Sequence, residues 1–304
     1  MARFGVEAIR YFNHARAAGV STAGDLTYTF NRSNGFDSTL RSAGHTRAFY
    51  WSDTAVWETD IRDTDQGGND GSWVDDVDLF WIETHGNSEA DGRARMLYDI
   101  AHSEWRTWSD RWQLGEDWNS EWVMAYSCHT VNLDAVAGLW NIFARLHIYC
   151  GAWGDMYDGT TTDECGEDVA DNLVDGDTVS GAWHDGVSDW WVDNHPVTVC
   201  VGDAASWNGG DIRWDLSALN RDHLWGHGSV SPDLAPAQQA CLLWKWTEGS
   251  EPIRVGGGKR MAMHGRCEQG ARRPHGEPCN DEQRSARLPG APGATHTYPD
   301  RLSP

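Results

Sequence analysis

The chain of 304 residues contains no apolar run of the roughly 18 residues that a transmembrane helix needs. Its first residues also lack the basic segment and the following apolar segment of a secretory signal. Seven cysteines are present, but they are odd in number and scattered, which is not the pattern of a disulfide framework. We therefore expect a cytoplasmic protein with reduced thiols and no membrane partner.

Positive charge is scarce: Lys and Arg number 24 against 46 Asp and Glu, and only Lys245 and Lys259 are lysines. A net charge of −22 would repel phosphates, so we expect no nucleic-acid partner. Residues 251–304 differ, because they hold nine basic and six acidic residues among many Gly and Pro and few apolar residues. This composition predicts a folded domain at residues 1–250 and a disordered Gly/Pro/Arg-rich tail at residues 251–304.

Strand-like and helix-like segments alternate along the folded part. The expected strands are residues 5–12, 46–57, 77–82, 122–126, 146–152 and 195–202. The expected helices are residues 35–43, 94–112, 133–143, 166–173 and 179–191. This alternation predicts an α/β fold with a mostly parallel central sheet and helices on both faces. The acidic residues at 60–71 lack the register of a calcium loop, so we expect that loop to be solvated.

Two of the apolar runs end in residues that can carry out chemistry. Residues 77–82 lead into His85 and Gly86, and residues 122–126 lead into Cys128. Short apolar runs of this type indicate buried parallel strands, and ligands bind at the carboxyl ends of such strands. The 43 residues that separate His85 from Cys128 leave room for one crossover helix between neighbouring strands.

Histidine and cysteine at this edge suit a cysteine peptidase. Cys128 would be the nucleophile and His85 its base, and the N–H groups of Gly86 and Cys128 would form the oxyanion hole. We also expect a helix after Cys128, whose N-terminal dipole would lower the thiol pKa. The substrate would be a peptide or protein, and this chemistry calls for no cofactor.

The same residues resemble the caspase-like cysteine peptidases, often called clan CD. Residues 127–130 read Ser-Cys-His-Thr, which is similar to the Ser-Cys-His-Ser of metacaspases. A strand, an acidic loop, a helix, Gly176 and residues 179–183 then resemble gingipain and CHAT-domain proteases. The resemblance covers roughly residues 5–203. It implies a caspase-like α/β/α sandwich with His85 and Cys128 as the catalytic dyad.

The specificity pocket departs from these relatives. Metacaspases carry an aspartate two residues before the cysteine, which helps to bind a basic side chain, and this chain has Tyr126 there. The loop after residues 146–153 instead offers Asp155, Asp158 and Asp163 as substrate-binding residues. Carboxylates beside the site would favour cleavage after Arg or Lys. The alternative is that these carboxylates are simply solvated.

Other functions remain open from the sequence. The same fold could serve as a non-catalytic binding module with a recognition surface made by some of the 19 tryptophans, although packing explains most of them better. The dyad could also carry out peptide ligation or acyl transfer, because both proceed through a thioester. The oligomeric state is not determined by the sequence.

Metal and nucleotide sites are weaker alternatives. One candidate zinc set has no pair of ligands at tight spacing; it comprises His85, His102, Cys128 and His129. A second candidate set matches no standard zinc finger; it comprises His264, Cys267, His275 and Cys279. The glycine run before Lys259 lacks the Ser or Thr that follows the lysine of a phosphate-binding loop.

Overall fold

The structure, a computed structural model, describes residues 1–116, 119–188, 194–203, 221–239, 241–247 and 265–267. The strands within these residues are β1 (Arg3–Ala8), β2 (Thr46–Ser52), β3 (Leu79–Glu83), β4 (Gly86–Ser88), β5 (Ala94–Leu97), β6 (Arg106–Trp108), β7 (Trp122–Tyr126), β8 (Ile148–Ala152), β9 (Pro196–Gly202), β10 (Cys241–Trp246) and β11 (Gly265–Cys267). The α-helices are α1 (Asn13–Ala17), α2 (Thr29–Ser42), α3 (Cys165–Asp175) and α4 (Val179–Val187).

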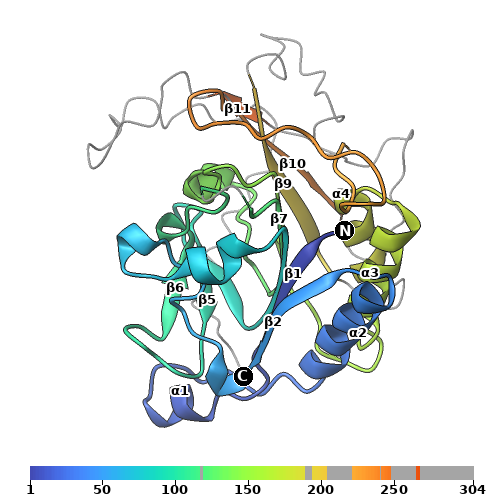
Figure 1. The fold of residues 1–304 in the computed structure, drawn as a ribbon. Helices are drawn as coiled ribbons and strands as arrows, with labels where there is room; N and C mark the ends of the chain where they lie inside the picture. The colour runs from blue at the N-terminus through green and yellow to red at the C-terminus, as the bar shows by residue number, and fades with distance from the viewer. Residues whose placement is uncertain (117–118, 189–193, 204–220, 240, 248–264, 268–304) are drawn as a thin grey trace.

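Within the described residues, the central sheet has the strand order β11-β10-β9-β8-β7-β3-β1-β2 (Figure 1). Each neighbouring pair from β2 to β8 is parallel, whereas β9, β10 and β11 continue the sheet in antiparallel pairs. The predicted fold class is confirmed: the protein is α/β with a mostly parallel central sheet. β10 and β11 were not predicted from the sequence.

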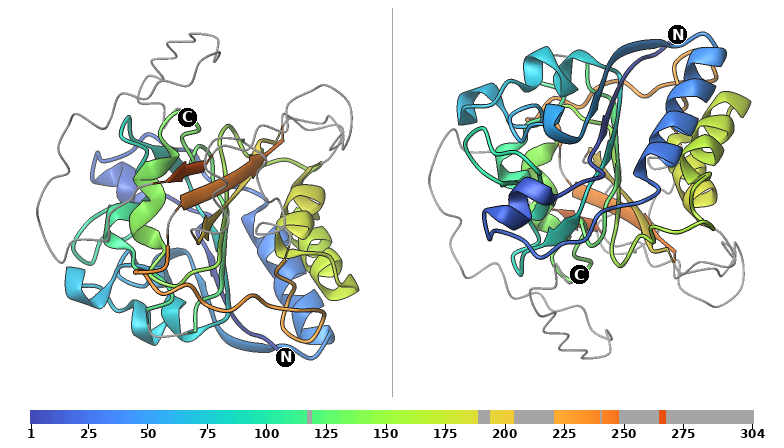
Figure 2. Two further views of the ribbon diagram at one scale, coloured as in Figure 1. Left: turned by 90° about the horizontal axis from the view of Figure 1, so that it is seen from above. Right: turned by 90° about the horizontal axis from the view of Figure 1, so that it is seen from below.

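Alternate side chains of the central strands enter two separate cores. On β3, Phe80 and Ile82 join one core, and Leu79 and Trp81 join the other. This division follows from the two-residue period of a strand, and it explains why strands buried on both faces read as continuous apolar runs. The second core is closed by α2, α3 and α4, which lie together on one face of the sheet (Figure 2).

The end of α3 and the start of α4 follow from local sequence. Gly176 takes the left-handed conformation (φ 93°) and ends α3, where a Cβ would be strained. The Oγ1 atom of Thr178 accepts a hydrogen bond from the N–H of Gly181 and caps α4. The two helices therefore pack as a short hairpin over the sheet.

The crossover helix predicted at residues 94–112 is wrong. This segment forms β5 and β6, which pair with β4 in a three-stranded antiparallel sheet on the other face of the molecule. Met96 and Leu97 of β5 enter the first core, so the apolar residues are buried as the pattern demands, but by strand pairing. Pairing with the neighbouring strands overrides the helical spacing.

The helix predicted at residues 133–143 is present only as a 3₁₀ helix over Val136–Ile142. Its buried residues pack on the first core. Other short 3₁₀ helices lie at Asp53–Ala55, Thr64–Gln66, Asp70–Ser72, Val74–Asp76 and Ser109–Arg111. The second face of the sheet is therefore covered by the small sheet and short helical turns.

The expectation that the acidic loop at residues 60–71 is solvated holds for Asp65 and its exposed neighbours but is wrong for three buried aspartates. Asp60, Asp63 and Asp70 are 3%, 0% and 1% exposed. Asp63 accepts a hydrogen bond from the N–H of Asp65 at 2.6 Å, and Asp70 accepts one from the N–H of Thr64 at 3.0 Å. The carboxylates bind backbone N–H groups of their own turns, which is why burial is tolerated.

The tryptophans of the described residues mostly serve packing. Trp81, Trp112, Trp122 and Trp183 are each 0% exposed, and among the described tryptophans Trp57 and Trp225 are exposed. No helix in the described part of the chain is both long and apolar enough to span a membrane.

The tail predicted at residues 251–304 lies outside the described residues, apart from Gly265–Cys267, which form β11 at the edge of the sheet. The division at residue 250 and the character of the tail stay predictions.

Candidate active site

The register of the central sheet brings the segments of His85 and Cys128 together. Glu83 of β3 pairs with Tyr126 of β7, and His85 and Cys128 each lie two residues beyond this pair. Because the two strands are parallel, both residues leave the sheet at the same edge. A Cβ on Gly86 would lie 2.5 Å from the carbonyl oxygen of Cys128, so the two segments touch and only glycine fits between them.

The Cys128 thiol is held by the backbone of the acidic loop. Its Sγ atom accepts a hydrogen bond from the N–H of Met156 at 3.3 Å and lies 3.5 Å from the carbonyl oxygen of the same residue. Burial raises the pKa of Cys128 to about 11, since the loss of solvation outweighs the Met156 N–H. The thiol is therefore protonated at neutral pH.

The predicted helix directly after Cys128 is absent. The next residue, His129, has a left-handed backbone (φ 52°), and its N–H donates to the carbonyl of Gly154. The following helical segment is the 3₁₀ helix that begins only at Val136. The expected lowering of the Cys128 pKa by a helix dipole is thus wrong, because the chain turns sharply instead of continuing into a helix.

His85 is fixed by a loop from the start of the chain. Its Nε2 atom lies 2.9 Å from the carbonyl oxygen of Gly24, and its ring lies 4.7 Å from the ring of Phe12. Burial lowers the pKa of His85, although the Gly24 carbonyl acts in the opposite direction. A carbonyl accepts but does not donate, so Nε2 carries the proton and Nδ1 holds the free lone pair of the neutral ring.

His85 and Cys128 hydrogen-bond to backbone atoms and not to each other. His85 binds Gly24, and Cys128 binds Met156. In this state a neutral imidazole and a neutral thiol share one sheet edge. In unliganded enzymes the hydrogen bond between a base and its nucleophile is often absent and forms only when substrate binds.

A buried ion-pair network lies next to the ends of β3 and β7. Arg32 of α2 donates from Nε to Glu83 at 2.6 Å and from Nη2 to Asp158 at 2.8 Å, and its guanidinium lies 4.5 Å from the centre of the Tyr126 ring. Arg32 and Glu83 are 1% and 0% exposed. The network joins α2, the end of β3 and the acidic loop, and sequence reasoning missed it because its members are far apart in the chain.

The three predicted substrate-binding aspartates differ in surroundings. Asp155 is 64% exposed and pairs with Nε2 of His129 at 2.9 Å. Asp158 already pairs with Arg32 and also accepts from the N–H of Tyr28 at 2.8 Å. Asp163 borders an open polar pocket. This pocket has a volume of about 570 Å³ and is lined by Thr160, Thr161, Asp163, Glu164, Cys165, Asp168, Gly186 and Ser188.

Tyr126, two residues before Cys128, is buried and hydrogen-bonded within the protein. It is 3% exposed, and its hydroxyl donates to the carbonyl of Tyr157 at 2.9 Å. It also accepts from the side-chain amide of Asn194 at 3.3 Å. Nothing in these contacts substitutes for the acidic residue that metacaspases carry there.

The first alternative zinc set is not assembled. The groups of potential metal-ligating atoms among the described residues do not include His85, His102 or Cys128. His102 stacks on Trp57 with 3.8 Å between the ring centres. The structure describes no side chain of the second zinc set, and the glycine run before Lys259 also lies outside the described residues.

Comparison with known proteins places the chain in a family. The chain belongs to the family described as "Domain of unknown function (DUF6345)", whose model matches residues 6–248. No curated protein matches it. Nine chains of solved structures match. One of them is the crystal structure of the Drosophila initiator caspase Dronc, with 12% identity, 62% of this chain and 72% of that chain covered, and a TM-score of 0.35. A likeness of that size does not assign an activity.

Proposed function

We propose that the protein is a caspase-like cysteine peptidase in which His85 and Cys128 form the catalytic dyad. The observation that carries the proposal is the register of β3 and β7. Glu83 pairs with Tyr126, and His85 and Cys128 each follow this pair by two residues, so both leave the sheet at the same ends of the strands. The close packing of Gly86 against Cys128 supports it further, because it leaves no room for a side chain between the two segments.

The proposed reaction begins with proton transfer. The Gly24 carbonyl holds the proton on Nε2 of His85, so Nδ1 accepts the thiol proton as Sγ of Cys128 attacks the scissile carbonyl carbon. The C–N bond then breaks, and the amine leaves with that proton. Water, deprotonated by the same Nδ1, hydrolyses the thioester, which releases the acid and restores the thiol. In this proposal the N–H groups of Gly86 and Cys128 stabilise the oxyanion.

Protonation of the resting dyad sets the character of the first step. The pKa of Cys128 is raised to about 11 and that of His85 is lowered, so a preformed thiolate–imidazolium pair is disfavoured. His85 therefore acts as a general base during attack. We expect substrate binding to release Cys128 from the Met156 backbone, which lets the thiol turn toward His85.

The proposed substrates are peptides or proteins with basic residues. Asp155 and Asp163 are the carboxylates best exposed to a substrate cation, because Asp158 is already paired with Arg32. The net charge of −22 would also attract cationic peptides. The proposed compartment is the cytoplasm, which the free thiols of Cys128, Cys150, Cys165 and Cys200 support.

A peptide-library cleavage profile tests the activity. Wild type is compared with Cys128→Ala and His85→Asn, and with Cys200→Ala of β9 and His102→Asn as matched controls for the loss of a cysteine or a histidine elsewhere. We expect cleavage by wild type and both controls and a loss of at least about 100-fold in each dyad variant. Cleavage that persists in Cys128→Ala would contradict the assignment.

A second measurement tests the substrate preference by itself. Fluorogenic peptides that differ only in the residue before the cleaved bond are assayed at low and high salt. We expect the fastest cleavage after Arg, and a preference that declines as salt screens the carboxylates. Equal rates after neutral or acidic residues would remove the acidic-pocket proposal and leave the dyad untouched.

A non-catalytic binding module is the second candidate. It is favoured by the raised pKa of Cys128 and by the separate backbone partners of the two dyad residues. A thiol-directed probe separates the candidates, since labelling of Cys128 that depends on His85 indicates an enzyme. If cleavage is found, an added amine distinguishes ligation from hydrolysis, because a ligase transfers the acyl group to the amine.

A further inference from the structure

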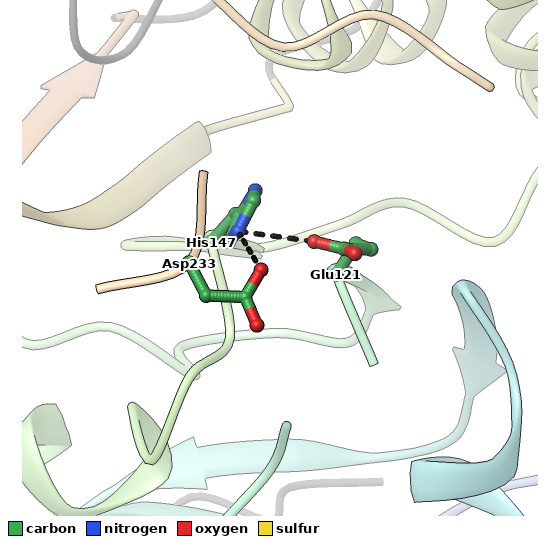
Figure 3. A group of neighbouring side chains, drawn as sticks. All are labelled: Glu121, His147 and Asp233. Carbon is green, nitrogen blue, oxygen red and sulfur yellow. Dashed lines mark ion pairs between the residues drawn. The ribbon is translucent and has the colours of Figure 1, made fainter. Parts of the chain in front are cut away.

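A second cluster of polar side chains lies at the amino ends of the central strands, opposite the ends that carry His85 and Cys128. Glu121 directly precedes β7 and His147 directly precedes β8, so both sit at the amino ends of these parallel strands (Figure 3). The N–H of His147 donates to the carbonyl of Glu121 at 2.9 Å, which fixes the two backbones side by side. This site is independent of Cys128 and His85.

A third side chain comes from the segment between β9 and β10. Asp233 points at the same ring nitrogen of His147 as Glu121 does (Figure 3). The Nε2 atom lies 3.0 Å from Oε2 of Glu121 and 3.4 Å from Oδ1 of Asp233, and one ligand atom of each residue lies within 4.8 Å of the other two. Donors bound to one tetrahedral Zn²⁺ at about 2.1 Å lie about 3.4 Å apart, so the three atoms need only small shifts to share an ion.

The other ring nitrogen of His147 is already engaged. Its Nδ1 atom lies 2.6 Å from Oδ2 of Asp222, a side chain that is 2% exposed. Asp222 is itself held by the N–H of Ser231 at 2.8 Å and by the indole N–H of Trp122 at 3.1 Å. A carboxylate that takes the Nδ1 proton directs the Nε2 lone pair outward, as in carboxylate–histidine–metal arrangements.

The Nε2 atom itself is what points to a missing ligand. The His147 side chain is 7% exposed, and within the described residues Nε2 is buried and makes no hydrogen bond. It faces two carboxylates, with a third on Nδ1, so the carboxylates outnumber the one basic side chain among them. A divalent cation bound to Nε2 and the two carboxylates supplies both the missing partner and the missing charge.

We propose that Glu121, His147 and Asp233 bind a divalent transition-metal ion, with Zn²⁺ the best fit. The imidazole ligand favours such an ion over Mg²⁺ or Ca²⁺, which prefer oxygen ligands. The ion joins the segment of Asp233 to the amino ends of β7 and β8. Three protein ligands leave the fourth position of a tetrahedral ion to water, and binding to the folded state alone stabilises that state.

The test uses the full-length protein after treatment with a chelator. Zn²⁺ is titrated by calorimetry into wild type, Asp233→Asn and Asp171→Asn. Asp233 is chosen because its side chain is 30% exposed, so the variant is expected to fold. Asp171→Asn removes an exposed carboxylate from α3 and controls for the general attraction of cations to this acidic chain.

We expect Asp233→Asn to lose one Zn²⁺ site, or to bind Zn²⁺ at least tenfold more weakly, while Asp171→Asn binds as wild type does. Zn²⁺ should raise the Tm of wild type and Asp171→Asn but not that of Asp233→Asn. Co²⁺ in wild type should give visible ligand-field bands that vanish in Asp233→Asn, without a thiolate charge-transfer band. Equal Zn²⁺ affinity and equal Tm shifts in all three proteins, or thiolate bands alone, would overturn the proposal.

Discussion

Replacing Gly86 by alanine adds one methyl group where the end of β3 meets the end of β7. The new Cβ would lie 2.5 Å from the carbonyl oxygen of Cys128 and 2.9 Å from Cβ of Ser127. Both distances are shorter than a carbon atom keeps from a non-bonded oxygen or carbon atom, so the two segments must move apart. Overpacking of this kind costs about 1–3 kcal/mol, which in a domain of about 150–250 residues lowers Tm by about 2–12 °C.

The matched control is Gly24→Ala. A Cβ on Gly24 meets no atom within 4 Å, and its carbonyl would still accept the hydrogen bond of His85. We therefore expect unchanged stability, or a gain of up to about 1 kcal/mol from the stiffer unfolded chain.

Scanning calorimetry of wild type and both variants measures the two effects, and alkylation of Cys128 reports whether its surroundings change. If Gly86→Ala matches Gly24→Ala in Tm and in labelling rate, the close packing of Gly86 on Cys128 is refuted.

Three further perturbations have definite expected outcomes. Arg32→Met leaves two carboxylates without their buried partner and should cost about 3–5 kcal/mol in urea unfolding. Arg41→Ala removes an exposed partner of Asp37, which keeps its ion pair with Arg47, and should cost about 1 kcal/mol or less. Equal costs would show that the buried network is not stabilising. Because burial raises the pKa of Cys128 to about 11, its alkylation should accelerate about tenfold per pH unit between about pH 7 and 9. A rate at Cys128 that is already constant near neutral pH would reveal a preformed thiolate. Truncation after residue 250 should leave the rest folded with a small drop in Tm, because it removes one three-residue edge strand from the described sheet; a large drop would contradict the predicted tail.

The strands around the candidate site could be predicted because they are buried on both faces. Leu79–Glu83 and Trp122–Tyr126 are buried at every position, and Glu83 at the end of β3 is the single charged residue in either run. Short loops beyond such strands carry polar residues, and His85 and Cys128 are the reactive ones there. Parallel pairing of the two strands was the simplest arrangement, and it is the one observed.

The segment that connects those strands could not be predicted in the same way. Residues 94–112 contain apolar residues at spacings that fit a helix, but β5 and β6 need β4 and each other as partners. A pairing between segments is not visible in either segment alone. The pKa of Cys128 was misjudged for another reason: burial raises it, and the left-handed turn at His129 replaces the expected helix.

The sequence by itself determined the fold class, the central strands and the strand ends from which His85 and Cys128 leave the sheet, because apolar periodicity is a local property of the chain. Only the tertiary structure decided the surroundings that set their chemistry. Gly24 binds His85 from 61 residues away in the chain, and Met156 binds Cys128 from 28 residues away. The cluster of Glu121, His147 and Asp233 likewise exists only because strand pairing and a returning segment bring the three together. Burial and charge act through distances in space, which no sequence spacing specifies.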